Sequence, residues 1–139
     1  IVGRSPTRRV RALARRPHVT VTGPVPDVRP YLRRASLSVA PFRIARGVQN
    51  KVLESMAMGI PVVGTKSAFQ GIQASEMDGV RIVDEPAAFA EQIVGLLGDA
   101  TVRATCSKQA RRYVERHHRW EAHGLAVDQL LPPVPAASR

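Results

Sequence analysis

Short runs of apolar, largely β-branched residues alternate along this chain with longer segments in which apolar residues recur every three or four positions. The short runs are typical of buried strands and the longer segments of amphipathic helices. Their alternation predicts βαβ units, which build a parallel sheet covered by helices. Strands are predicted near residues 1–3, 18–22, 37–40, 61–64 and 80–83, and helices over 6–16, 27–35, 48–58, 86–98, 100–118 and 120–131.

The local signals at the element ends also predict where the folded domain stops. Asp27 is suited to cap the N-terminus of the helix predicted over 27–35, because its carboxylate can accept a backbone N–H. Three prolines follow Leu131 closely and cannot continue a helix. We therefore expect one domain over residues 1–131 and a disordered tail over 132–139.

The segment from Arg46 to Thr65 holds the most informative pattern in the chain. Gly47 ends a loop, an amphipathic helix follows, Gly59 ends that helix, and Pro61 begins a buried strand. A helical wheel predicts one apolar and one polar side, so that Glu54 faces away from the sheet. The apolar side consists of Val48, Val52, Leu53, Met56 and Ala57, and the polar side of Asn50, Lys51, Glu54 and Met58.

The start of this helix is suited to binding a phosphate. Its first backbone N–H groups, from Gly47 to Asn50, have no partner within the helix, and the helix end carries about half a positive charge. Further along, the carboxylate of Glu54 could accept hydrogen bonds from both hydroxyls of a ribose. A solvated glutamate on the polar face of a surface helix explains the same spacing, and the pattern alone leaves both interpretations open.

The residues from Leu53 to Val63, Leu-Glu-Ser-Met-Ala-Met-Gly-Ile-Pro-Val-Val, resemble a motif of retaining family-4 glycosyltransferases with the GT-B fold. In that family the nucleotide-sugar half carries Glu-x7-Glu followed by Ala-Met-Ala-x-Gly-x-Pro-Val. The resemblance implies an α/β fold, a Rossmann-like parallel sheet with flanking helices that forms the C-terminal half of GT-B. It also implies that Glu54 binds the ribose of the donor.

The chain departs from this motif at the first glutamate, whose position is taken by Arg46. An arginine cannot accept hydrogen bonds, but it can form a bidentate contact with a phosphate. The residues from Ile44 to Glu54 look like a subgroup of sugar transferases associated with bacterial exopolysaccharide and exosortase (PEP-CTERM) gene clusters, in which arginine-glycine is the normal form. We therefore interpret Arg46 as a phosphate or sugar ligand. A nucleotide-sugar-binding module that has lost transfer activity is the alternative.

The resemblance implies transfer of a sugar from a UDP- or GDP-linked donor to a hydroxyl acceptor, with retention, in exopolysaccharide or cell-surface glycan synthesis. It implies no metal and no cofactor, because amides and basic side chains hold the donor phosphates in that fold. The predicted catalytic residues are Arg46 and Glu54. The predicted donor-binding residues are Gly23, Val25 and Pro26 near the base, and Gly47, Val48, Gln49, Asn50 and Lys51 near the diphosphate and sugar.

The resemblance also implies that these residues are part of a larger enzyme. Its sheet has the strand order 3-2-1-4-5-6, and residues 1–3 match the second strand, so the first and central strand has no counterpart. We expect an N-terminal acceptor domain elsewhere in the full-length chain, and we expect these 139 residues on their own to fold poorly.

Charge is the outstanding feature of the composition, with 21 basic against 11 acidic residues and a net charge of +10. Such a balance suits nucleic acid, anionic membranes or phosphorylated ligands. Aromatic residues make up only 4% of the chain, too few for a typical single-strand binder. We therefore expect mainly solvated arginine faces and no nucleic acid, with an arginine-rich nucleic-acid binder as the lesser alternative.

Two further predictions concern location and partners. No run reaches the roughly 18 apolar residues of a membrane-spanning helix, so we expect a soluble or peripheral cytoplasmic protein. The resemblance implies a glycan or lipid-linked acceptor, and with it contact with an anionic membrane surface. Cys106 is the single cysteine and cannot form an internal disulfide, and the histidines show no metal-site spacing.

Overall fold

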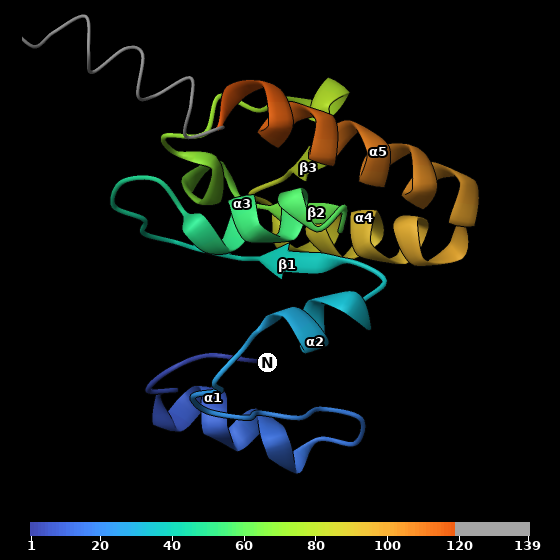
Figure 1. Cartoon of the computed structure of the whole chain (residues 1–139). Helices are drawn as coiled ribbons and strands as arrows, with labels where there is room; N and C mark the ends of the chain where they lie inside the picture. The colour runs from blue at the N-terminus through green and yellow to red at the C-terminus, as the bar shows by residue number, and fades with distance from the viewer. Residues whose placement is uncertain (119–139) are drawn as a thin grey trace, which may run out of the picture. The chain divides into compact units, whose positions relative to one another are not determined.

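The computed structural model describes residues 1–118, which divide into two compact units between Ala35 and Ser36 (Figure 1). We call residues 1–35 the N-terminal unit and the residues from Ser36 onward the sheet unit. The helix predicted over 120–131 and the tail predicted over 132–139 lie outside the described residues. The single domain over residues 1–131 therefore stays a prediction.

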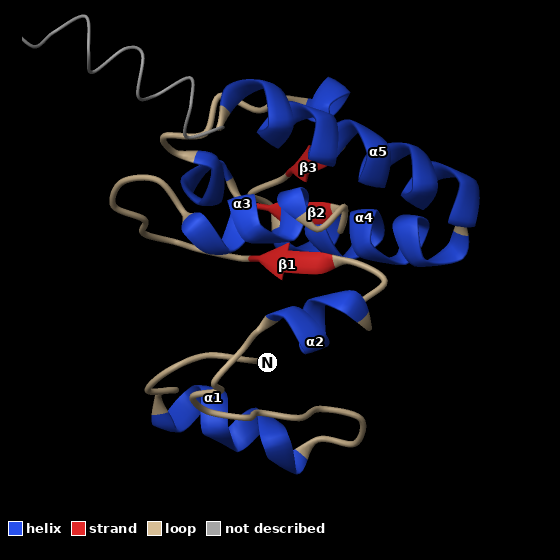
Figure 2. Ribbon diagram, viewed as in Figure 1, coloured by secondary structure: helices blue, strands red, loops and turns tan. Residues whose placement is uncertain are grey.

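Three short parallel strands form the sheet: β1 (Ser38–Ala40), β2 (Val62–Gly64) and β3 (Val80–Ile82) (Figure 2). Their order is β1-β2-β3, with β2 in the middle. All three strands lie where the apolar runs predicted them, and they are neighbours in the order that the resemblance implies for the last three strands. The α/β fold with a parallel sheet is confirmed.

The sheet is covered by helices on both faces, α3 (Asn50–Ala57) on one and α4 (Pro86–Gly98) on the other (Figure 1). Successive strand residues point to opposite faces, so Val62 and Val63 belong to different buried clusters. The first cluster joins β2 to α3, and the second joins it to α4. Helix α5 (Ala100–His117) supplies Cys106, Ala110 and Tyr113 to these clusters.

Hydrogen bonds between sequence neighbours set the ends of the three sheet-unit helices. Helix α4 has its predicted bounds, α5 ends one residue earlier than predicted, and α3 begins two residues later and ends one residue earlier. The carboxylate of Glu85 accepts the N–H groups of Ala87 and Ala88, at 3.0 and 2.7 Å, and so caps α4. Asp99 caps α5 in the same way. Gly59 ends α3, as predicted, with a left-handed φ of 69° and its N–H donating to the Met56 carbonyl.

Two of the predicted strands, both in the N-terminal unit, are not formed. Residues 1–3 and 18–22 are not strands, although backbone hydrogen bonds join the two segments, and His18 has a left-handed φ of 62°. The Thr22 N–H donates to the Ile1 carbonyl at 3.0 Å, and the Gly3 N–H donates to the Gly23 carbonyl at 3.2 Å. Two short segments without a third partner among the described residues of this unit do not build a regular ladder.

The helices of the N-terminal unit are shorter than predicted. Helix α1 (Arg8–Ala12) passes into a 3-10 turn (Leu13–Arg15), and α2 (Arg29–Arg33) spans only five residues. Neither helix has a buried residue, and short helices gain most of their stability from packing. Asp27 does act at the start of α2, because its carboxylate accepts the Arg29 N–H at 2.9 Å.

Candidate functional site

The loops that follow the three strands meet at one edge of the sheet. Because the strands are parallel, their carboxyl ends lie on the same side, where α/β proteins commonly bind ligands. The Thr65 hydroxyl after β2 donates to the Phe42 carbonyl after β1 at 2.6 Å. The Ser67 hydroxyl donates to the Arg43 carbonyl at 3.3 Å. The loop after β1 is thereby held by the residues after β2.

The third strand is tied to the same edge. The Lys66 N–H donates to a carboxylate oxygen of Asp84, which follows β3, at 2.9 Å. The two side chains also form an ion pair with a distance of 3.7 Å between Nζ and Oδ2. These contacts join three separate loops into one surface next to the start of α3.

Two residues shape the loop that leads into α3. Gly47 has a left-handed φ of 66°, and a Cβ placed there would meet nothing within 4 Å. The backbone is therefore open to the close approach of a ligand at this point. The Gln49 side-chain amide donates to the carbonyls of Arg46 and Gly47, at 3.2 and 3.1 Å, and so closes the loop on itself.

The N-terminus of α3 has free donors. The N–H groups of Val52 and Leu53 both donate to the Gln49 carbonyl. Within the described part of the chain, no acceptor binds the N–H groups of Asn50 and Lys51, and no side chain caps this end. No acidic residue lies in the first turn to neutralise the partial positive charge. This end of the helix is open to an anion.

Helix α3 is anchored to the sheet by apolar contacts and by one buried hydroxyl. Val52 and Met56 are fully buried, as the helical wheel predicted. Ser55 is buried too, and its hydroxyl lies within hydrogen-bonding distance of Ser38 Oγ (3.0 Å) and of the Lys51 carbonyl (2.9 Å). The pattern missed Ser55 because its residue type suggests exposure. Its spacing three residues after Val52 was the available signal.

The side chains of Lys51 and Glu54 point away from the core, as predicted. The Lys51 ammonium lies 5.6 Å from the centre of the Phe42 ring, a cation–π contact that holds it over the loop. The Glu54 carboxylate has neither a hydrogen bond nor an ion pair with any of residues 1–118. Its carboxylate therefore remains available to a ligand.

Arg46 lies in the loop before α3 and is exposed. No carboxylate among residues 1–118 pairs with Arg46 or with its neighbour Arg43. With Lys51, the loop before α3 and the first turn of the helix carry three exposed cationic residues. The site is thus strongly suited to a ligand with more than one negative charge.

The helical-wheel prediction is wrong for Val48. It precedes α3 and is 48% exposed, although the pattern assigned it to the apolar side. Its contact comes from a distant residue, because a Cβ on Gly71 would approach the Val48 side chain to 3.2 Å. Gly71 has a left-handed φ of 82° and lies directly behind the loop, a support that local spacing could not indicate. Ala57, also assigned to the apolar side, is exposed at the last turn of α3.

The structure brings together seven of the predicted site residues in the sheet unit. They are Arg46, Gly47, Val48, Gln49, Asn50, Lys51 and Glu54. The other three belong to the N-terminal unit. There Gly23 has a left-handed φ of 72°, Val25 is half-buried and Pro26 is exposed.

Two absences among residues 1–118 concern metal sites and membrane spans. Among these residues, no three histidine, cysteine, aspartate or glutamate side chains are grouped so that they could hold a metal ion. Over the same range, no helix combines the length and the apolar character needed to cross a bilayer.

Comparisons with known proteins cover residues of both units. The sequence profile of the family described as glycosyl transferases group 1 matches residues 1–99. No curated protein matches the chain.

Two solved structures resemble the chain closely. Sucrose-phosphate synthase from Thermosynechococcus elongatus has a TM-score of 0.78 and 25% sequence identity, over 93% of this chain and 36% of its own. The glycosyltransferase WaaG, involved in lipopolysaccharide biosynthesis, has a TM-score of 0.77 and 21% identity, over 95% of this chain and 37% of its own. The chain therefore spans little more than a third of the length of either structure, and the predicted fold is confirmed.

Proposed function

The chain belongs to the family of group 1 glycosyl transferases, and on this premise we propose that the loop before α3 and the first turns of α3 hold the nucleotide diphosphate of a sugar donor. One observation carries the proposal. Among residues 1–118, no acceptor binds the N–H groups of Asn50 and Lys51 at the helix start, and no partner binds the exposed carboxylate of Glu54 one turn later. Two exposed arginines, Arg43 and Arg46, lie in the loop directly before this helix.

The diphosphate would lie against the open end of α3. The N–H groups of Asn50 and Lys51 donate to its oxygens, and the Lys51 ammonium adds a positive charge from its place over Phe42. Gly47 lets the phosphate approach the backbone, because no side chain stands there. Negative charge grows on the diphosphate as the bond to the sugar loosens, so fixed donors and cations stabilise the transition state more than the bound donor.

Glu54 would hold the ribose. An ionised carboxylate accepts hydrogen bonds from two neighbouring hydroxyls, and the Glu54 carboxylate is exposed on the same helix. Arg46 would contact the diphosphate or the transferred sugar with its planar guanidinium. Gly23, Val25 and Pro26 are proposed for the nucleotide base on the resemblance to the family motif.

The remaining features of the reaction rest on the same resemblance. We propose transfer to a hydroxyl acceptor with retention, using a UDP- or GDP-linked sugar without a metal, in bacterial exopolysaccharide or cell-surface glycan synthesis. The acceptor site would belong to an N-terminal domain of the full-length protein. The two solved structures are longer than this chain, which covers only 36% and 37% of them, and so contain further residues beyond the matched part.

A second candidate is a non-catalytic nucleotide-sugar-binding module, which Arg46 in the place of the motif glutamate favours. Turnover separates the two. The full-length protein would be incubated with UDP- and GDP-linked hexoses, and release of the nucleotide would be followed together with the anomeric configuration of the product.

We expect turnover with one donor class, and a loss of at least tenfold in Arg46→Ala. The control Arg112→Ala removes an exposed arginine of α5 and should leave turnover unchanged. Nucleotide binding without turnover, and without discrimination between UDP and a UDP-sugar, would support the binding module. No binding of either nucleotide would refute the proposed function itself.

A further inference from the structure

The N-terminal unit carries most of the net charge of the chain. Its 35 residues contain nine arginines and one aspartate, a side-chain charge of +8 out of the total of +10. The rest of the sequence has twelve basic and ten acidic residues and is nearly balanced. The charge is therefore concentrated in one of the two units.

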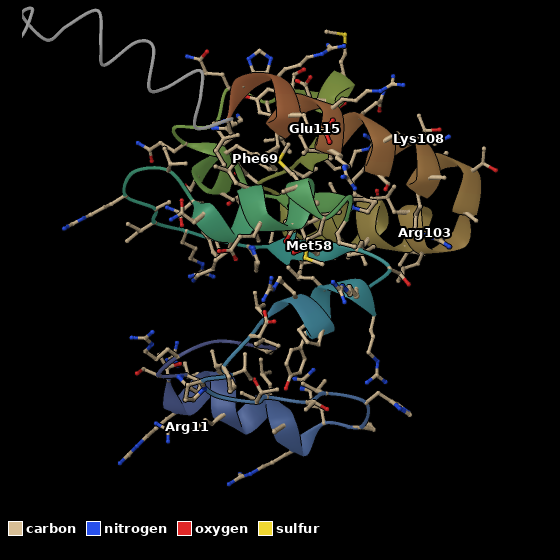
Figure 3. The ribbon with its side chains drawn as sticks, viewed as in Figure 1. Arg11, Met58, Phe69, Arg103, Lys108 and Glu115 are labelled. Carbon is tan, nitrogen blue, oxygen red and sulfur yellow. The ribbon has the colours of Figure 1, made fainter. Side chains whose placement is uncertain are left out.

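Three of these nine arginines share one face of α1 and the 3-10 turn after it. Val10 and Leu13 are half-buried, whereas Arg8, Arg11 and Arg15 are exposed. Spacings of three and four residues place these three on the same side, where they line an open hollow together with Ala12. The Nε of Arg11, labelled in Figure 3, donates to the Pro6 carbonyl at 3.0 Å, and its two terminal amino groups have no hydrogen-bond partner among residues 1–118. We call these four residues the arginine face.

The arginine face has no counter-charge among the described residues. The one acidic residue of the unit, Asp27, pairs with Arg29 at 3.0 Å. None of the three arginines forms an ion pair with any of residues 1–118. Like charges three and four residues apart destabilise a helix, and α1 has no buried residue that would offset this. An external anion would remove the repulsion.

The shape and composition of the unit indicate which anion fits. Guanidinium groups match phosphates well, and the face is an open, exposed row rather than an enclosed pocket. Tyr31 is the only Phe, Tyr or Trp in the N-terminal unit and lies on α2, so bases have no stacking platform beside the arginines. Helix α1 spans five residues, too few for a reading helix in a major groove.

We propose that the arginine face docks on the phosphate headgroups of an anionic lipid membrane. The interaction is electrostatic: the face has no large apolar side chain to insert, and each guanidinium contacts lipid phosphate. Each basic residue near an anionic membrane strengthens binding about fivefold. Removing the three arginines should therefore weaken binding about 100-fold.

The test is co-sedimentation of the full-length protein with vesicles. Vesicles of phosphatidylcholine with about a third phosphatidylglycerol are compared with pure phosphatidylcholine, for wild type and for Arg8→Gln/Arg11→Gln/Arg15→Gln. The matched control, Arg111→Gln/Arg112→Gln/Arg116→Gln, removes the same charge from exposed positions of α5. A third variant replaces Arg8, Arg11 and Arg15 by lysine and keeps the charge.

We expect wild type to bind only the anionic vesicles, increasingly weakly as salt is added. The affinity for anionic vesicles should fall about 100-fold in the glutamine triple variant and only a few-fold in the lysine triple variant. The α5 control should bind these vesicles as wild type does, within the error of the measurement. If the glutamine triple does not fold, single variants with an expected fivefold loss replace it.

Three outcomes would overturn the proposal: equal losses in the two glutamine triples, equal binding to both vesicle types, or no binding to the anionic vesicles. If a DNA duplex binds at physiological salt in competition with the vesicles and the arginine face is needed for it, the partner is nucleic acid instead. None of these outcomes affects nucleotide binding at α3, so the proposed function is tested separately.

Discussion

Glu54→Ala, combined with a nucleotide that lacks ribose hydroxyls, tests the α3 site directly. The Glu54 carboxylate is exposed and has no partner among residues 1–118, so its removal should leave the fold unchanged. A hydrogen bond to a charged group contributes about 1.5 to 3 kcal/mol when it forms. For two bonds at an exposed position we take the lower end, about 2 to 3 kcal/mol together, which is roughly a 30- to 150-fold weaker Kd.

The assay is isothermal titration of the full-length protein with UDP, GDP and 2′,3′-dideoxy-UDP. If Glu54 holds the ribose, the dideoxy nucleotide should bind wild type about as weakly as UDP binds Glu54→Ala. The dideoxy nucleotide should then bind both proteins equally, because the contact is already missing. Glu91→Ala removes an exposed glutamate of α4 and serves as the control.

Two results would refute the reasoning. Unchanged UDP affinity in Glu54→Ala would remove the ribose assignment. Equal losses for UDP and for the dideoxy nucleotide would show that Glu54 acts on some other part of the ligand. If the protein binds GDP rather than UDP, the same test applies with guanine nucleotides, because the ribose hydroxyls of GDP and UDP are the same.

Three further predictions concern the loop, the core and the pH dependence. Gly47→Ala forces a left-handed residue at φ 66°, a strain of about 1 to 2 kcal/mol, and titration should show weaker nucleotide binding while circular dichroism shows an unchanged fold. Met56→Ala, at a fully buried position, should lower the free energy of unfolding by about 2 to 5 kcal/mol in urea titrations, whereas Met77→Ala, 82% exposed, should change it by less than about 0.5 kcal/mol. Backbone hydrogen bonds lower the pKa of Glu85 below its model-compound value of 4.5, so this cap stabilises the fold above that pH and is lost as the pH falls through the folded-state pKa. Glu85→Gln should therefore lower Tm at pH 7 and approach wild type in acid, and a pH-independent difference, or the same effect in Glu91→Gln, would contradict this.

The elements of the sheet unit were predictable because local signals and burial agree there. Glu85 and Pro86 mark the start of α4, and Gly59 the end of α3, through hydrogen bonds that involve only sequence neighbours. The apolar pair Val62 and Val63 predicts a strand buried on both faces. The N-terminal unit was predicted less well, because its short helices have no buried residue to extend them.

The candidate site shows the same division. The helix start, the exposed carboxylate of Glu54 and the loop glycine follow from residue type and spacing along one segment. The contacts that shape the site come from residues far away in the chain: Gly71 behind Val48, Thr65 on the Phe42 carbonyl, and Ser55 against Ser38.

The sequence by itself determined the parallel α/β architecture, the amphipathic helix with Glu54 on its outer side, and the excess of arginine. Only the tertiary structure decided that Val48 is exposed, that Ser55 is buried, that Lys51 lies over Phe42 and that Glu54 has no partner within the described chain. The reason is physical. Periodicity and caps depend on hydrogen bonds and side-chain directions within a few residues, whereas burial and pairing depend on which distant backbone segments pack together.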